Sequence, residues 1–518
     1  MNSYNIIIEL VSDLSEIEEK VVLKTIKGQF RKSNRLLEIY DYLVVKKKTD
    51  SEFLIAKIYE GRSKNAVDAF RKLCDRFLEI VLSSLVSSEI FDHDRHKYSD
   101  IFYYRKWVRG RLDVLLPISL KKLRNEDKIK FYKEIEVLCR KFEFIEELII
   151  VLYELKGATY SIGFERGREH YERELISQSL NLSNRIIADL YVDKYITSVQ
   201  HFSVDDKGVV KDLARAIEHV GEIYRSSPLV NIKFSLLMLK LQYFHFIEDF
   251  VAAEILMFEI IELTNNNACV RYYSRIGQNY MNLAYTQFFL NKFDDAYKNA
   301  LLASERSTNS VIGMNLYKES CVFALIYLKK YQEADALVDD ILSSKDTGNY
   351  PGEYSKRKLM HAYIKFLLGE YKTAFILLQD TKEIETDREG WNLGIRMLNI
   401  FLTLSTSKVD LADQRIGSMR KHIERTSKMR NLRKRDILIF RILSHLSRSG
   451  FDFKETWEER KKDFELLRTG GGDYRWIPRS HELVIFDQWF EAKMLNRPYD
   501  PVFPKPVEQQ KVEKISEN

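Results

Sequence analysis

The chain has 518 residues and a formal net charge of +6, and 45% of its residues are hydrophobic. This length is enough for three or four domains of about 150 residues, each with its own core. Its 20 glycines and 8 prolines are about half of the share found in average proteins, which excludes a low-complexity or largely disordered chain.

Neither the cysteines nor the hydrophobic segments point to secretion or to a membrane. The four cysteines occur singly along the chain, unlike those of a zinc site or a disulfide scaffold: Cys74, Cys139, Cys269 and Cys321. The first 20 residues lack the basic region and cleavage site of a secretory signal. No segment approaches the roughly 18 apolar residues that cross a bilayer. We therefore expect a cytoplasmic protein without a membrane span.

Residues 1–155 are expected to form an N-terminal helical domain that contains a basic three-helix segment at residues 35–88. Residues 20–130 carry 26 Lys or Arg and 15 Asp or Glu. The second short helix is expected to begin at Thr49, with Glu52 completing a capping box. In the third helix, apolar residues recur on one helical face: Phe70, Leu73, Cys74, Phe77, Ile80 and Val81. This order of helices is typical of a helix-turn-helix DNA-binding domain and also of any small helical bundle.

A short pattern recurs in the middle of the chain, where an aromatic residue is followed three positions later by an alanine. The clearest copy runs from Phe293 to Ala296 between two apolar helical stretches, and the other copies end at Ala253, Ala334 and Ala374. Successive alanines are 43, 38 and 40 residues apart. Small side chains allow two helices to cross closely, and periods of about 20 to 50 residues indicate a repeat architecture.

In these features the chain resembles the tetratricopeptide repeat (TPR) family. The matching residues are a leucine and a small residue in the first helix, the aromatic residue at the turn and the alanine of the second helix: Leu283, Ala284, Phe293, Tyr331, Tyr371, Ala296, Ala334 and Ala374. The match is best over residues 230–382. Periods of 38 to 43 residues exceed the family's roughly 34, which implies longer helices or loops. The resemblance implies an all-α fold, namely a right-handed α-solenoid of helix hairpins with a concave peptide-binding face.

We expect the solenoid to cover residues 156–450, a C-terminal helical cap to follow at residues 451–497, and a disordered tail to occupy residues 498–518. The terminal repeats of a solenoid are atypical, and residues after Gly472 lack the repeat pattern but are strongly aromatic. We interpret them as a short helix that folds back on the last repeats. The tail is polar and rich in proline, a composition typical of disorder.

The resemblance implies a non-enzymatic scaffold or adaptor that binds a protein or peptide segment in its concave groove. Six residues of the predicted repeats are candidates for the groove: Tyr243, Asn279, Asn282, Gln287, Lys318 and Lys365. No phosphate-binding loop, nucleophile elbow or dinucleotide fingerprint occurs in the sequence. We therefore predict no enzymatic activity and no cofactor. His93 and His96, with Asp92, Asp94 and Asp100 nearby, could in principle hold a metal ion. They lie in a polar stretch without a sulfur ligand or a second cluster to complete the site, so no metal site is predicted.

The alternative hypothesis is a DNA-binding regulator, with an N-terminal helix-turn-helix and the solenoid as its sensor or dimerisation arm. Its candidate residues lie off the apolar face of the third short helix: Lys64, Arg71, Lys72 and Arg76. Such side chains are needed for phosphate contacts. Asp68, Asp75 and Glu79 share the same polar surface. Nucleic acid is therefore a second candidate partner, through residues 20–130, and the sequence does not indicate an oligomeric state.

Overall fold

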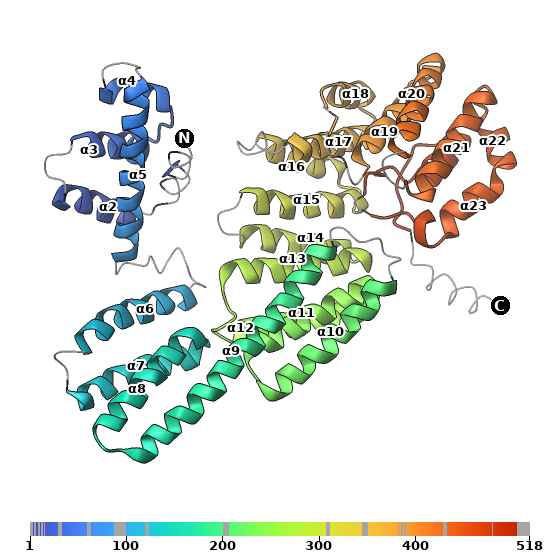
Figure 1. Cartoon of the computed structure of the whole chain (residues 1–518). Helices are drawn as coiled ribbons and strands as arrows, with labels where there is room; N and C mark the ends of the chain where they lie inside the picture. The colour runs from blue at the N-terminus through green and yellow to red at the C-terminus, as the bar shows by residue number, and fades with distance from the viewer. Residues whose placement is uncertain are drawn as a thin grey trace. The chain divides into compact units, whose positions relative to one another are not determined.

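The computed structural model describes residues 4–504 with gaps, at residues 5–6, 9–10, 12–13, 15, 30–33, 60–63, 88–99, 120–123, 200–206, 307–310, 344–350, 382, 385–386, 388–389, 428–431 and 479. Within these described residues there are twenty-three α-helices and no β-strand (Figure 1). The predicted all-α fold class is confirmed. The chain divides into two compact units, residues 1–107 and residues 108–518.

The first unit contains the basic segment. Its helices are α2 (Glu16–Gln29), α3 (Asn34–Tyr40), the π-helical turn η1 (Asp41–Val45), α4 (Ser51–Tyr59), α5 (Lys64–Ser87) and the beginning of α6 (Asp100–Ser119). On α5 the predicted apolar face is buried, with Leu73 half-buried, and it packs in one core with residues of α2, α3 and α4. A helix-turn-helix is not established by this arrangement and stays a prediction.

The start of α4 differs from the expectation by two residues. The helix begins at Ser51, and the carboxylate of Asp50 accepts hydrogen bonds from the backbone amides of Glu52 (2.9 Å) and Phe53 (3.1 Å). Asp50 is therefore the N-cap in place of Thr49, because its carboxylate oxygen reaches the free amides of the first turn.

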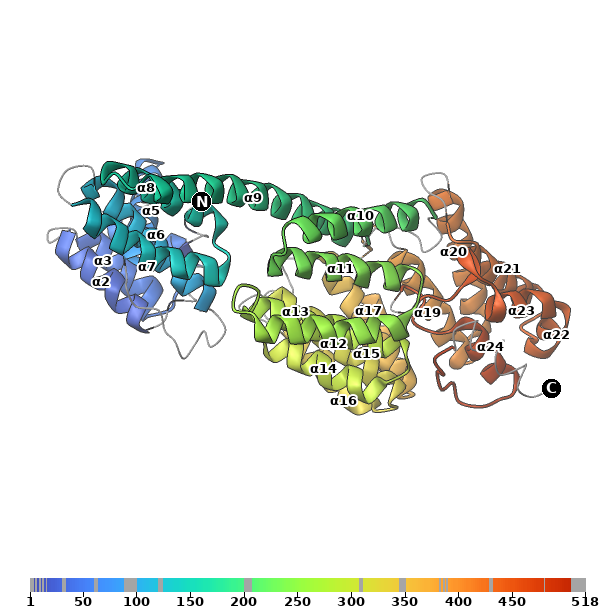
Figure 2. The same ribbon diagram turned by 90° about the horizontal axis from the view of Figure 1, so that it is seen from below.

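The second unit begins with the rest of α6 and continues with three helices packed in sequence. These are α7 (Asn125–Phe142), α8 (Ile145–Ser161) and α9 (Glu165–Val199), and α9 continues past α8 to contact α10 (Lys207–Ser226) and α11 (Val230–Phe246) (Figure 2). The compact unit with the basic segment thus ends at Trp107, whereas we expected an N-terminal domain of residues 1–155. The boundaries expected at residues 155 and 450 remain predictions.

Successive helix hairpins follow, each packed against the next. Their bounds are α11 with α12 (Phe250–Asn266), α13 (Tyr273–Phe289) with α14 (Phe293–Glu305), α15 (Val311–Tyr327) with α16 (Tyr331–Ser343), α17 (Pro351–Leu367) with α18 (Tyr371–Gln379), α19 (Trp391–Ser405) with α20 (Val409–Ser427), and α21 (Lys434–Arg448) with α22 (Phe453–Glu459). The first helices α11, α13, α15 and α17 each have 17 residues.

The turns of five hairpins share one backbone geometry. In each three-residue turn the middle residue has a positive φ, between 56° and 76°: Glu248, Asn291, Lys329, Gly369 and Ser407. The next amide donates to the carbonyl of the residue five positions earlier, as Lys330 does to Leu325 at 3.0 Å and Glu370 to Lys365 at 2.9 Å. This Schellman-type closure satisfies the last carbonyls of the first helix and starts the second helix at a fixed angle.

The alanine positions predicted from the sequence lie at the helix crossings. Ala253, Ala296, Ala334 and Ala374 are each at most 3% exposed. A fifth alanine, Ala412, is fully buried at the same place in α20, although the sequence pattern around it lacks the aromatic residue. Small side chains at these positions let the helices of each hairpin approach closely, and the prediction of a nested repeat stack is confirmed.

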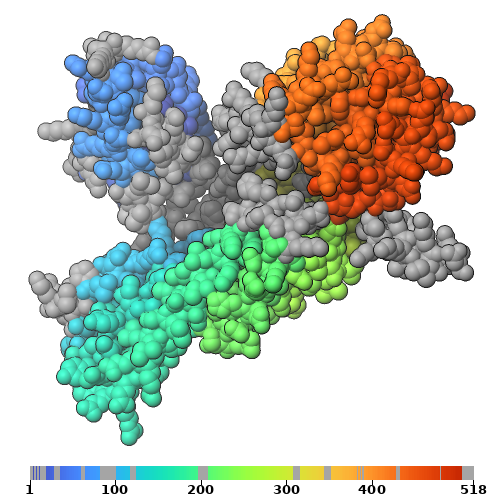
Figure 3. All heavy atoms as spheres, turned by 45° about the vertical axis from the view of Figure 1, so that its right-hand side comes forward, coloured from blue at the N-terminus to red at the C-terminus, as the bar shows by residue number. Residues whose placement is uncertain are grey.

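The C-terminal helices close the stack. They include α23 (Lys461–Thr469) and α24 (Phe486–Met494), separated by the short 3-10 turn η3 (Gly472–Tyr474). As expected, this part folds back on the last repeats: the ring centroid of Trp489 lies 4.2 Å from that of Phe401 on α19. One hydrophobic core runs from α15 to α24, and in the space-filling view the orange-to-red helices form a closely packed mass (Figure 3).

A buried ion cluster fixes the irregular segment before α24. Arg435 of α21 donates to both carboxylate oxygens of Glu482, at 2.6 and 2.8 Å, and to Asp487 at 3.3 Å. It also donates to the backbone carbonyls of Leu467 (2.7 Å) and Tyr474 (3.0 Å). Because the guanidinium is fully paired, the charge can be buried without a large penalty.

The tail is packed at its beginning. Residues 498–504 contact the repeats through Tyr499, Asp500 and Phe503, so these seven residues differ from the expected disordered tail. The aromatic side chains of these residues pack against aromatic rings of the hairpins. Amino-acid composition predicts disorder without regard to such contacts with distant parts of the chain. Residues 505–518 lie outside the described part.

Candidate peptide-binding site

Among the described residues, the non-helical stretch 498–504 lies against the turn ends of several hairpins. It is named here the tail segment. Its residues contact α17 through Tyr499, the turn before α16 through Asp500, and α13, α14 and α15 through Phe503. The tail segment therefore runs across the repeats in the direction opposite to their order. Proline at 498, 501 and 504 fixes φ at every third residue and keeps this stretch from forming a helix.

Phe503 inserts into a cluster of aromatic rings. Its neighbours come from the end of α13, the start of α14, the end of α15 and the segment before α24, with ring centroids 5.2 to 6.3 Å away: Phe288, Phe289, Phe293, Tyr327 and Trp476. Most of these pairs are edge-to-face, the favourable arrangement for aromatic rings. The aromatic residues at the hairpin turns thus form a receptor surface for a further aromatic side chain.

Asp500 is held by a positive charge and a hydroxyl from one turn. Lys329 Nζ lies 2.5 Å from its carboxylate, and Tyr331 Oη donates to the same oxygen at 2.7 Å. Lys329 also donates to the backbone carbonyl of Pro501. Burial alone would raise the pKa of the Asp500 carboxyl, but the hydrogen bonds from Lys329 and Tyr331 and the charge of Lys329 outweigh it and hold the pKa below its usual value.

A glutamine of the cap recognises the backbone of the tail segment. Gln488 Nε2 donates to the carbonyl of Val502 at 2.7 Å, and the amide of Val502 donates back to Gln488 Oε1 at 2.9 Å. The hydroxyl of Tyr499 accepts a hydrogen bond from the amide of Ile485 at 2.9 Å. The side chain of Val502 itself is 64% exposed. The site therefore binds the backbone of residue 502 and the side chains of residues 499, 500 and 503.

A cleft of about 670 Å³ lies beside the tail segment, between the cap and the turn of α11 and α12. Its charged residues pair with one another: Arg468 lies 3.1 Å from Glu491 and 3.5 Å from Asp487, and Arg475 pairs with Glu248. Another part of the wall is apolar and includes Phe250, Phe289 and Phe503. The cleft is an extension of the same site, because Asp500, Val502 and Phe503 of the tail segment line it.

The six candidates predicted for the groove are not brought together at this site. Tyr243 lines a separate apolar hollow of about 540 Å³ between α10, α11 and α12. Asn279 is buried and donates to Thr264 of the preceding hairpin at 2.9 Å. Gln287 is buried and bonded to Glu254 (3.3 Å) and Asn299 (2.8 Å).

The other three candidates also have hydrogen-bond or ion-pair partners within the stack. Asn282 accepts a hydrogen bond from Gln278 at 3.1 Å. Lys318 lies 2.5 Å from Asp340 on α16. Lys365 lies 2.6 Å from Asp335 and 3.2 Å from Glu370. Lys318 and Lys365 connect neighbouring helices of the stack, whereas the bond of Asn282 lies within α13. A role of these residues in a groove remains a prediction. Lys329 and Gln488 were not predicted as site residues, and Tyr331 was predicted only as an aromatic residue of a hairpin turn. A lysine two residues before that aromatic residue was a visible signal.

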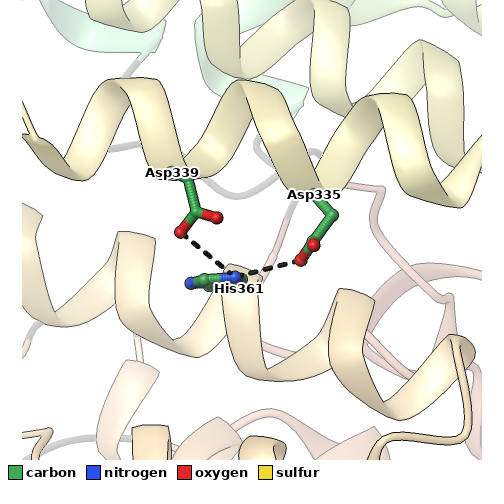
Figure 4. Close-up of side chains that lie close together, drawn as sticks. All are labelled: Asp335, Asp339 and His361. Carbon is green, nitrogen blue, oxygen red and sulfur yellow. Dashed lines mark hydrogen bonds and ion pairs between the residues drawn. The ribbon is translucent and has the colours of Figure 1, made fainter.

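One group of described residues has the spacing of metal ligands. Asp335 and Asp339 of α16 and His361 of α17 place one ligand atom each within 4.8 Å of the others (Figure 4). His361 Nε2 lies 3.0 Å from Asp335 and 3.5 Å from Asp339. The ammonium of Lys365 already neutralises Asp335, so the arrangement is accounted for as an ion network between two helices. His93 and His96 lie outside the described residues.

The basic residues of the alternative hypothesis share α5. Arg71, Lys72 and Arg76 are exposed, and Lys64 is the first residue of the helix. Asp68, Asp75 and Glu79 are exposed on the same helix, and Asp68 lies 4.0 Å from Arg71. The surface is therefore mixed in charge.

The hairpin geometry defines this chain as an all-α protein of stacked helix hairpins. Among solved structures, the chain is similar to the TPR domain of P58(IPK), at 11% sequence identity, with 79% of this chain and 99% of that chain covered and a TM-score of 0.20. This score is too low to carry a structural argument, so the class rests on the hairpins themselves. No protein-family model and no curated protein matches the chain. Within the described residues, no helix is long and apolar enough to traverse a bilayer.

Proposed function

We propose that this chain is a non-enzymatic, cytoplasmic scaffold or adaptor whose repeats bind a segment of a partner protein. The observation that supports the proposal is the tail segment, a non-helical stretch of polypeptide held by side chains from several hairpins. A surface that binds one extended segment through side-chain contacts and backbone hydrogen bonds can bind a similar segment of another protein in the same way. TPR-like folds generally serve such binding.

The test compares two exposed leucines of the repeats. Leu316 on first helix α15 and Leu301 on second helix α14 are each 43% exposed. Helix α15 carries both Leu316 and Tyr327, which contacts Phe503, so we propose that a partner segment extends from the turn aromatic residues along the first helices. Leu316→Asp should then abolish capture of the partners that the full-length chain retains from its native lysate, whereas Leu301→Asp should leave capture unchanged. Mass spectrometry of the captured proteins measures both. Equal capture by the two variants would contradict the proposal.

The second candidate function is DNA binding through α5, favoured by the exposed side chains of Arg71, Lys72 and Arg76. Phosphate contacts make affinity fall with salt, with a slope of about 0.9 per contact. A salt titration of the full-length chain with duplex DNA should therefore show a slope that the Arg71→Glu, Lys72→Glu and Arg76→Glu triple variant reduces. Absence of binding at low salt would remove this function.

A further inference from the structure

We propose that the tail segment is an internal ligand that occupies the peptide-binding site, and that partner segments with the same chemistry bind by displacing it. That chemistry is an aromatic residue followed directly by an aspartate and, three residues later, a second aromatic residue, as in Tyr499, Asp500 and Phe503. The inference rests on the proposed function and narrows it to one class of partner segment.

The first argument is that the contacts have the pattern of ligand recognition. Side chains at residues 499, 500 and 503 are received by the repeats, whereas the side chain of Val502 points to solvent and only its backbone is bound. Such alternation of anchored and exposed residues is the way in which an extended peptide is recognised by a surface.

The second argument is complementarity of charge and shape. Lys329 is placed at the middle of a hairpin turn, where its positive φ is part of the turn geometry, and its ammonium meets both the carboxylate of Asp500 and the carbonyl of Pro501. The aromatic rings around Phe503 come from two hairpins and the cap. A partner segment needs an acidic residue between its two aromatic residues to satisfy both features.

The third argument is that the tail segment can leave without unfolding the cap. Helix α24 ends at Met494, and its aromatic residues Trp489 and Phe490 are fully buried by other contacts. The carboxylate of Asp500 is 60% exposed and the Lys329 side chain 39% exposed, and exposed ion pairs are weak. A tethered segment competes at an effective concentration in the millimolar range. The internal ligand should therefore weaken binding of an external segment until it is displaced.

The experiment uses the full-length chain and a fluorescent peptide with the sequence of residues 496–504. We expect the Asp500→Ala, Phe503→Ala double variant to bind the peptide at least 10-fold more tightly than the unmodified chain, measured by fluorescence anisotropy. Val502→Ala is the matched control, because residue 502 contributes only its backbone, and should bind like the unmodified chain. Adding Lys329→Ala to the double variant should weaken binding several-fold, because both the ion pair with the aspartate and the hydrogen bond to the following carbonyl are lost.

A second measurement does not depend on the variants. In the unmodified chain, saturating peptide should speed hydrogen exchange of the Val502 amide, since that amide loses its bond to Gln488 when the tail segment leaves. Equal peptide affinity in the double variant and the unmodified chain, or no change in exchange at Val502, would overturn the proposal. If Leu316→Asp abolishes partner capture while the peptide fails these tests, the scaffold function stands and the internal ligand does not.

Discussion

At the residue scale, the fully buried Arg435 is the charge that stabilises the cap most directly. Removing it leaves Glu482 and Asp487 buried without their partner, so Arg435→Ala should lower the free energy of unfolding by about 3–5 kcal/mol. Arg441→Ala, at an exposed position of the same helix, should change it by less than about 0.5 kcal/mol. Urea titration measures both, and equal losses would show that the buried ion cluster does not carry this stability.

A second residue-scale prediction concerns pH. His481 Nε2 lies 3.0 Å from Asp436, and both side chains are buried. Burial alone would lower the pKa of His481, but Asp436, with Glu482 and against Arg433, raises it above its usual value. Burial alone would raise the pKa of Asp436, but His481, Arg433 and Arg435 hold it below its usual value.

The directions of these two pKa shifts determine how the stability of the protein changes with pH. The stabilisation from His481 is complete below its pKa in the unfolded chain, about 6.5, and is lost as the pH rises through its pKa in the folded protein. The stabilisation from Asp436 is complete above its pKa in the unfolded chain, about 3.9, and is lost as the pH falls through its pKa in the folded protein. His481→Gln should therefore reduce the loss of stability that occurs as the pH rises above about 6.5, measured by urea titration. His170→Gln, at an exposed position, should retain it. An unchanged slope in His481→Gln would contradict the assignment.

At the element scale, the hairpin depends on a small residue at the crossing. Ala334 is fully buried in α16, whereas Ala336 of the same helix is exposed. Ala334→Leu should force the helices apart and cost about 1–3 kcal/mol, and Ala336→Leu should be tolerated because its side chain enters solvent. Thermal unfolding of the two variants compares them directly, and equal melting temperatures would show that the crossing has room for a larger side chain.

At the scale of the whole molecule, a stack of hairpins transmits a local defect to its neighbours. Stability in such arrays is a sum of repeat and nearest-neighbour terms. Hydrogen exchange in Ala334→Leu should therefore accelerate in α13–α18 before α21–α24. Uniform acceleration over α11–α24 would indicate that this part of the chain opens as one cooperative unit.

The repeats could be predicted from local patterns, and the candidate site could not. Ala296, Ala334 and Ala374 are spaced for hairpin crossings because each hairpin is built from neighbouring residues. By contrast, Asp500 pairs with Lys329, which lies 171 residues earlier in the sequence. Asn279 and Gln287, which we predicted for the groove, are instead buried and hydrogen-bonded within the stack. Hydrophobic spacing shows that a face is buried, but it does not show which distant segment covers it.

The sequence by itself determined the all-α class, the hairpins and the small residues at their crossings, because turn chemistry and helical periodicity act over a few residues. Only the tertiary structure decided that the cap is fixed by buried Arg435 and that residues 498–504 lie on the turn aromatic residues. The physical reason is that these contacts join segments far apart in the chain, and complementary shape and charge exist only after the repeats have stacked.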